Sequence, residues 1–223
     1  MSGWTEKPVD GVKTDARPHP AGAKGAHLSL QEVADRAWTA RMSPRLRAWV
    51  TQQLDKCGVS RGSRRQKMQC VLDAFRKKVP YIADPVMGEF METPEQTLCL
   101  DENGLCYIGT DCDGASITLI ACALSIGIPA MVIGSSHKEP LDVPTHVFGA
   151  FQDELEDWVK MDGTTRYPVG QVAPHSREWW VEPGKQAKDT AQGDFVGMSG
   201  DKSRDGTLSG PASVLDLVYP GIR

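Results

Sequence analysis

The segment at residues 109–134, GTDCDGASITLIACALSIGIPAMVIG, places one cysteine between two aspartates at the start of an apolar stretch. Thr110 or Asp111 can cap a helix that Cys112 opens, because apolar residues follow at helical spacing. Backbone amides at a helix N-terminus stabilise a thiolate, so this position favours a nucleophilic cysteine. The charges of Asp111 and Asp113 oppose a thiolate, and the sequence leaves open whether they point away from the sulfur.

A histidine and an aspartate follow on two expected strands, at 145–151 and 157–162. A hairpin with its loop centred on Glu154 would set His146 directly opposite Asp162. Opposed residues have Cβ atoms about 4.5–5.5 Å apart, so the carboxylate could accept a proton from the imidazole. The expected register therefore predicts a histidine backed by a carboxylate, and a slip of one residue would remove the contact.

Cys112, His146 and Asp162 are together the parts of a nucleophilic acyl-transfer site. The imidazole takes the thiol proton, and the carboxylate fixes the tautomer of the ring and stabilises the imidazolium. A lone cysteine in an apolar helix is more commonly a small buried hydrophobe, and we interpret Cys122 in that way. The histidines at 19, 27, 137 and 175 lie in polar or irregular stretches and are expected to be solvated.

The segments GTDCDGASITLIACALSIGIPAMVIG, PTHVFGAF and DWVKMDGTTRYPVG resemble the transglutaminase-like branch of the papain-like cysteine protease superfamily. In that branch a cysteine opens a helix that ends in a Gly-Ile-Pro turn, and a His-bearing strand and an Asp-Pro-Thr-like strand end follow. The resemblance covers about residues 80 to 170 and implies a catalytic triad of Cys112, His146 and Asp162. DGTT has glycine where proline is commoner. The compact form is similar to small microbial and bacteriophage members.

The resemblance also implies a second donor for the oxyanion, beside the backbone amide of Cys112. Tyr107 and Gln96 are the candidates for that role. The six cysteines form no CxxC pair, which argues against a zinc knuckle and against a dense disulfide framework. We therefore expect most cysteines to be buried thiols, and we expect no metal and no cofactor.

Composition limits the classes of partner. The chain has 223 residues and a net charge of -4, so it offers no basic surface for nucleic acid. Its longest apolar run is interrupted by Gly127 and Pro129, which argues against a membrane span. The N-terminus shows no export signal, so the expected location is cytoplasmic, with association with a virion as an alternative.

Helical periodicity comes first along the chain and strand-like alternation comes last, an order that predicts an α+β fold with the cysteine helix packed on a small antiparallel sheet. The capping box Ser29–Glu32 marks the start of the first helix, and Trp179 with Trp180 is assigned to the core or to a lid. The expected helices lie at about 29–42, 44–57, 64–79 and 112–126, with a helical turn at 93–96, and the expected strands at 130–134, 145–151 and 157–162.

The same reading divides the chain into a flexible arm (1–28), a catalytic domain (29–182) and a glycine-rich tail with an apolar end (183–223). Either terminal segment could bind an assembly partner.

Three functions remain open: hydrolysis of peptide or side-chain amides by a thiol peptidase or deamidase, formation of isopeptide bonds by a transglutaminase, and a non-catalytic role in a phage particle. The first is favoured, with a protein or peptide as the substrate.

Overall fold

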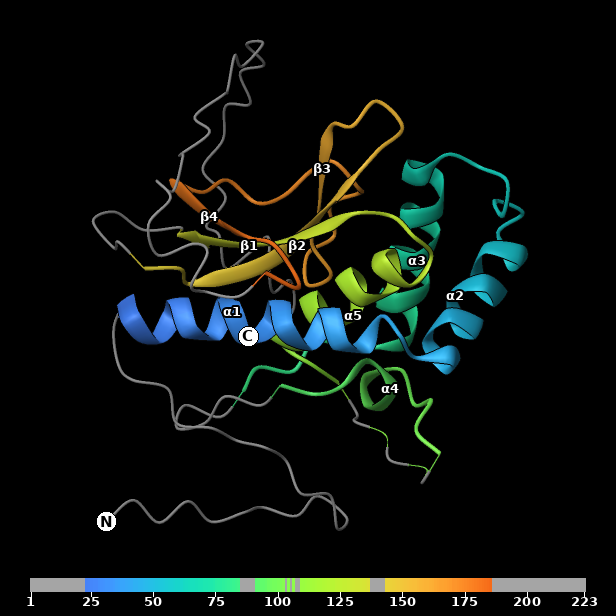
Figure 1. Cartoon of the computed structure of the whole chain (residues 1–223), viewed down its shortest axis with the longest axis horizontal. Helices are drawn as coiled ribbons and strands as arrows, with labels where there is room; N and C mark the ends of the chain where they lie inside the picture. The colour runs from blue at the N-terminus through green and yellow to red at the C-terminus, as the bar shows by residue number, and fades with distance from the viewer. Residues whose placement is uncertain are drawn as a thin grey trace, which may run out of the picture.

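The computed structural model describes residues 23–84, 91–102, 104, 106, 109–136 and 143–185. Within them five helices precede four strands, as Figure 1 shows. The α+β class predicted from the sequence is confirmed. The elements are α1 (Ala23–Ala40), α2 (Pro44–Lys56), α3 (Arg64–Lys78), α4 (Pro94–Thr97), α5 (Cys112–Ser125), β1 (Ala130–Ser136), β2 (His146–Gln152), β3 (Trp158–Met161) and β4 (Arg177–Val181).

Side-chain caps start three of the helices where the sequence predicts them. Ser43 accepts a hydrogen bond from Leu46 N before the Pro44 that opens α2. Ser63 and Thr93 each form a complete capping box, at the starts of α3 and α4. These helix starts need only local information, which is why the sequence predicts them to within one residue.

The first helix does not begin at Ser29, so its predicted start is wrong. Helix α1 begins at Ala23, six residues before that serine, so Ser29 lies inside it and residues 23–28 belong to the helix rather than to an arm. Its buried face, with Leu30, Val33 and Ala37, packs against α5 and the sheet. Tertiary packing therefore extends the helix through a position that resembles a cap.

The four strands form one antiparallel sheet in the order β3-β2-β1-β4. In Figure 1 α1 runs along one side of this sheet, and α5 lies beside α1 beneath β2. The fourth strand was not predicted from the sequence: REWW pairs with β1, with Trp180 opposite Ile133. Trp179 is buried in the core, in agreement with the core alternative stated for this pair.

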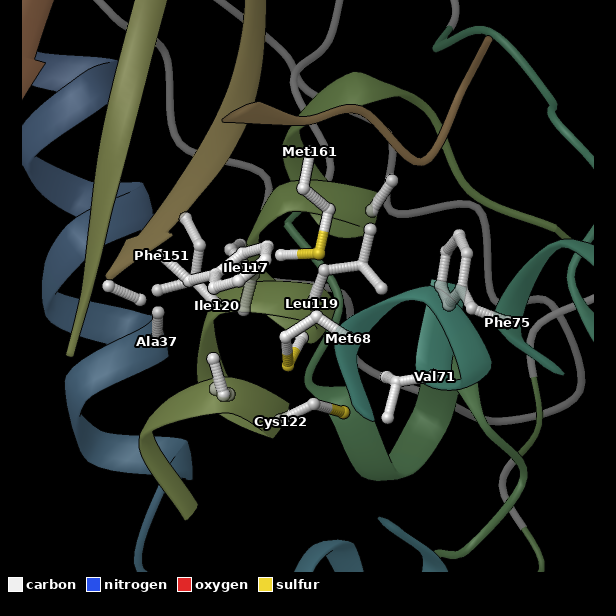
Figure 2. Close-up of a cluster of buried hydrophobic side chains, with 14 of the residues drawn as sticks. Ala37, Met68, Val71, Phe75, Ile117, Leu119, Ile120, Cys122, Phe151 and Met161 are labelled. Carbon is white, nitrogen blue, oxygen red and sulfur yellow. The ribbon is translucent and has the colours of Figure 1, made fainter. Parts of the chain in front are cut away.

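Helix α5 is buried along nearly its whole length, because the sheet, α1 and α3 surround it. Figure 2 shows Leu119 and Ile120 of this helix between Phe151 and Met161 of the sheet and Met68 of α3. A helix enclosed in this way has a fixed axis. The residue at its N-terminus, Cys112, is therefore held on a rigid support.

The expected state of the cysteines is wrong for four of the six. Cys57 at the end of α2 is bonded to Cys70 of α3, with Cα atoms 6.4 Å apart, and Cys99 is bonded to Cys106. Spacing in the sequence gave no sign of the first pair because the packing of α2 on α3 brings its partners together, whereas the second pair closes a short loop after α4. Cys122 is a buried thiol, as predicted, and Cys112 is a partly buried one.

Over the residues the structure describes, no helix is both long enough and apolar enough to cross a membrane.

Candidate active site

Cys112 is the first residue of α5, and the residue before it caps the helix. Asp111 Oδ1 accepts hydrogen bonds from the backbone N–H of Asp113 at 2.9 Å and of Gly114 at 3.3 Å. The predicted cap is confirmed, with Asp111 rather than Thr110 in that role. Part of the Asp111 charge is therefore directed to the helix amides.

An isolated parallel β-bridge between Tyr81 and Thr110 fixes where α5 begins. Thr110 N donates to the carbonyl of Pro80 at 3.1 Å, and Ile82 N donates to the carbonyl of Thr110 at 3.0 Å. Gly109 lies so close to this segment that an added Cβ would stand 2.6 Å from the Pro80 carbonyl oxygen. The chain that leads into Cys112 is therefore joined to the residues that follow α3.

His146 and Asp162 are in contact, with His146 Nε2 2.9 Å from Asp162 Oδ2. The aspartate side chain is 1% exposed and the imidazole 17%. Because an ionised carboxylate only accepts, Nε2 carries the proton of the neutral ring and Nδ1 is its basic nitrogen. The predicted partnership of these residues is thus present in the structure.

The strand register behind this contact differs from the predicted one. Gly149 pairs with Met161 and Ala150 with Lys160, so continuing the ladder places Phe148, not His146, opposite Asp162. His146 reaches the carboxylate along the diagonal, on the same face of the sheet. The prediction of direct opposition is therefore wrong by two residues, although the side chains meet.

The hairpin loop explains the shift. Asp153 Oδ1 accepts from the N–H groups of Leu155 and Asp157, and Glu156 has φ +66°. Asp153 N also donates to the carbonyl of Asp157 at 3.0 Å. The turn is therefore centred on Leu155, one residue beyond the expected centre. A side chain that bonds to the backbone has set the register.

Asp162 is held by a residue that sequence reasoning did not single out. Thr164 donates to Asp162 Oδ1 from its backbone N–H at 2.9 Å and from its hydroxyl at 2.8 Å. Burial alone would raise the pKa of Asp162, but the hydrogen bonds from His146 and Thr164 outweigh it and hold the pKa below its ordinary value. Asp162 is therefore ionised at neutral pH. The sequence signal for this support was the threonine two residues after the aspartate.

The sulfur of Cys112 lies 3.6 Å from Asp113 Oδ1. It also receives a hydrogen bond from the backbone of Val147, the residue that follows His146. The structure thus brings the thiol to the start of the histidine-bearing strand. The Val147 N–H is a functional group that the sequence could not reveal, because it depends on how α5 meets β2.

The thiol environment raises the pKa of Cys112. Burial is the largest cause, the charges of Asp113 and Asp111 add to it, and the hydrogen bond from Val147 opposes it. The expected depression by helix amides and His146 is therefore reversed, and Cys112 is a neutral thiol at neutral pH. Activation of the sulfur requires removal of its proton during attack.

A buried carboxyl group lies beneath the first turn of α5. Glu92 accepts a hydrogen bond from the Thr110 hydroxyl at 2.9 Å, and a Cβ added to Gly114 would stand 2.3 Å from its Oε2. Burial raises the pKa of Glu92 to about 7, which the charge of Asp111 reinforces and Arg36 opposes. Gly114 is therefore the residue that leaves room for this carboxyl group. No sequence pattern pointed to Glu92.

The two residues predicted as oxyanion donors have different outcomes. Tyr107 lies outside the described residues. Gln96 is part of the capping box of α4, where its Oε1 accepts from Thr93 N at 3.0 Å. This local bond accounts for the Gln96 side-chain oxygen, and its role as a donor to an oxyanion stays a prediction.

The expectation that the histidine at 175 is solvated is wrong. His175 Nδ1 lies 2.8 Å from the carbonyl oxygen of Ala173, and its Nε2 contacts Glu178, which also contacts Lys160. The hydrogen bond with Glu178 raises the pKa of His175. The ring packs on Phe148, with centroids 5.8 Å apart. This cluster joins β3, β4 and the segment before β4, so it has a structural role.

Comparisons with known proteins give fold-level similarity only. No family model and no curated protein matches the chain. A proposed cysteine protease from Cytophaga hutchinsonii aligns at TM-score 0.40 and 14% identity, over 66% of this chain and 44% of that one. A structure described as a TGase aligns at TM-score 0.34 and 16% identity, over 73% of this chain and 37% of that one. This chain spans less than half of either structure, and the function is argued from the site alone.

Proposed function

We propose that the chain is a cysteine-dependent acyl hydrolase that acts on peptide or side-chain amides. The observation that carries the proposal is the contact of His146 with the buried, ionised Asp162, at the strand where Val147 donates a hydrogen bond to the Cys112 sulfur. A thiol, an imidazole and an orienting carboxylate are the groups that nucleophilic acyl transfer requires.

The reaction begins from the neutral thiol. Nδ1 of His146 takes the proton of Cys112 while the sulfur attacks the carbonyl carbon, and Asp162 stabilises the imidazolium that forms. The imidazolium then gives the proton to the leaving nitrogen as the C–N bond breaks, which leaves a thioester on Cys112. Water attacks the thioester with His146 as the base, and the acid product is released with the thiol restored.

Backbone amides supply the stabilisation of the oxyanion in this scheme. Cys112 is the first helical residue of α5, and helix geometry leaves its N–H without an intrahelical acceptor. Such donors act in a partly desolvated site, where a hydrogen bond to a developing charge is strong. Tyr107 and Gln96 are the candidates for a second donor.

A transglutaminase reaction is the second candidate, because an amine could resolve the same thioester. Two results separate the candidates when a glutamine-bearing peptide is incubated with and without a primary amine and its mass is measured. Hydrolysis cleaves the peptide or adds about one dalton to it, whereas transfer adds the mass of the amine less that of the ammonia released from the glutamine. A peptide unchanged under both conditions favours the non-catalytic role in a particle.

Two variants serve as controls for this experiment. Cys112→Ala should abolish every mass change, because it removes the nucleophile. Cys122→Ala removes the other free thiol, which is buried in the core away from the candidate site, and should retain the reaction. Loss of activity in both variants would argue for a general effect of cysteine removal and against the assignment of Cys112.

The identity of the substrate and the partners of the terminal segments are part of the proposal. A protein or peptide substrate follows from the chemistry of amide cleavage. Residues 1–22 and 186–223 lie outside the described residues, so binding of an assembly partner by either end, in a phage particle or elsewhere, is proposed from the sequence alone.

A further inference from the structure

The last turn of α3 contacts the main chain that carries Asp162. Arg76 Nη2 donates to the carbonyl oxygen of Asp162 at 2.6 Å and to that of Tyr167 at 2.7 Å. The arginine is 86 residues before the aspartate in the chain. One guanidinium nitrogen therefore joins two points of the loop that follows β3.

The same helix holds this loop at a second point. Gln69, two turns before Arg76 on α3, accepts a hydrogen bond from Val169 N at 2.8 Å. Between the two anchors the loop is packed tightly, because a Cβ added to Gly163 would stand 3.1 Å from Phe75 of α3 and 2.9 Å from Leu119 of α5. The first part of the loop is thus fixed by hydrogen bonds at Asp162, Tyr167 and Val169 and by the contact of Gly163 with two helices.

Electrostatic attraction also holds Arg76 beside Asp162. The guanidinium of Arg76 interacts with the carboxylate of Asp162 and with that of Asp73 on its own helix. Its Nε is buried and has no hydrogen-bond partner. Burial of a cation with an unsatisfied donor is costly unless charge and other hydrogen bonds offset it. The two carbonyls and Asp162 provide that offset, so the position of Arg76 depends on the aspartate and its loop.

We infer that Arg76 is a positioning residue for the candidate triad: it fixes the main chain of Asp162 and places a positive charge beside it, so that Oδ2 stays on Nε2 of His146. Arg76 acts through Asp162, because its contacts are with the loop and with acidic side chains. The expected effect of Arg76 on turnover rests on the proposed function. Its expected effect on the His146–Asp162 contact does not depend on which reaction the protein catalyses.

The test compares Arg76→Gln and Arg76→Lys with Arg65→Gln as the matched control. Arg65 lies on the same helix and holds the opposite end of the same hairpin, through a contact of 2.9 Å with Asp153. The first readout is the nuclear magnetic resonance signal of the proton on His146 Nε2, recorded on the whole chain. The second readout is kcat and KM for the glutamine-bearing peptide.

In the wild type the Nε2 proton should be a slowly exchanging, downfield signal, since it is shared with a buried carboxylate. Arg76→Gln should broaden or remove that signal and lower kcat on the order of 10-fold to 100-fold with little change in KM, because a small displacement of the orienting group costs turnover. Arg76→Lys keeps the charge but not the fork of donors, so it should give an intermediate signal and kcat. Arg65→Gln should match the wild type.

Two results would overturn the inference: a folded Arg76→Gln protein with the wild-type signal, or loss of the signal in Arg65→Gln as well. If Arg76→Gln does not fold, the Arg76→Lys protein provides the test. A wild-type His146 signal and a wild-type kcat in that variant would contradict the positioning role of Arg76. Absence of turnover in the wild type would contradict the proposed function, but the resonance of His146 would still test Arg76.

Discussion

His146 and Asp162 meet along a diagonal of the β2–β3 hairpin, with Nε2 2.9 Å from Oδ2, and not as a directly opposed pair. A diagonal pair depends on where the end of β3 is held, because the strand itself ends at Met161. The hydrogen bonds of Thr164 and the contacts of α3 with the loop fix the position of Asp162. The contact is therefore a property of the surrounding structure as much as of the strand register.

Asp162→Asn should leave the protein folded and reduce kcat on the order of 10²-fold to 10⁴-fold. An amide can donate to His146 Nε2 and so stabilise the tautomer in which Nδ1 carries the proton and cannot act as the base. Steady-state kinetics with circular dichroism as the check on folding measures this. Asp157→Asn, an exposed change on the same hairpin, is the control and should have wild-type kcat.

The reaction of Cys112 with iodoacetamide should be slow at neutral pH, and its rate should still be rising above the pH at which an ordinary thiol has ionised. Its pKa is raised by burial and by the charges of Asp113 and Asp111, and only the thiolate reacts. Asp113→Asn removes one of those charges, lowers the thiol pKa and should increase the rate at pH 7 several-fold. Residue-resolved mass spectrometry gives the rates.

Cys122 is the internal reference for this labelling experiment, because it is a fully buried thiol with a raised pKa. It should label more slowly than Cys112 at every pH in the folded protein. Fast labelling of Cys112 at pH 7 that does not change in Asp113→Asn would contradict the assigned environment of the sulfur.

Glu92 should make the protein less stable as the pH rises from about 4.5 to about 7. Burial raises the pKa of Glu92 in the folded protein from its ordinary value of 4.5 to about 7. Between these two pH values the carboxyl group ionises in the unfolded chain but not in the folded one, so the unfolded chain is favoured. The loss is on the order of 3 kcal/mol when the shift is converted to free energy. Glu92→Gln keeps an acceptor for Thr110 and should remove this part of the pH dependence.

Denaturant unfolding at pH 4 and pH 8 measures that effect. The two proteins should differ little at pH 4, whereas Glu92→Gln should be the more stable one at pH 8. Equal stability of the two proteins at pH 8 would show that the carboxyl group is not held in the environment described here.

Removal of the disulfide between α2 and α3 should destabilise the fold without abolishing the reaction. The bridge between Cys57 and Cys70 closes a loop with a sequence separation of 13, for which chain entropy predicts about 3 kcal/mol. The double variant Cys57→Ser/Cys70→Ser should therefore unfold at lower denaturant, with kcat retained at 25 °C. Wild-type stability in that variant would contradict a bridge in the native protein.

The disulfides also bear on where the protein works. Paired cysteines persist in oxidising compartments and are rare in the cytosol, and the cytoplasmic location expected from the sequence stays a prediction. Counting free thiols in the protein isolated without reductant tests this. Two thiols per chain is the expected result, and six would favour the cytoplasmic expectation.

The parts of the fold that depend on local chemistry were predictable from the sequence. The caps at Ser43 and Ser63, the cap of the cysteine helix by Asp111 and its end at Gly127 all rest on a few adjacent residues. The pairing of His146 with Asp162 was predictable as a partnership, because His146 begins β2 and Asp162 directly follows β3, the neighbouring strand.

What the sequence could not reveal depends on contacts between distant segments. The Val147 N–H at the sulfur and the Arg76 contact with the Asp162 carbonyl both require the packing of a helix against the sheet or its loop. The pKa of Cys112 was mispredicted for the same reason, since burial is its largest cause and burial is a property of the assembled core.

The central claim is that Cys112 forms a thioester with the acyl group of its substrate, and the most direct measurement is the intact mass of the protein during turnover. Acid quenching of the wild type with a glutamine-bearing peptide should show a fraction of chains heavier by the acyl group, and peptide mapping should place that group on Cys112. Asp162→Asn should accumulate less of this adduct, and Cys112→Ala none. Turnover of the peptide by the Cys112→Ala protein, or an adduct mapped to another residue, would contradict the account.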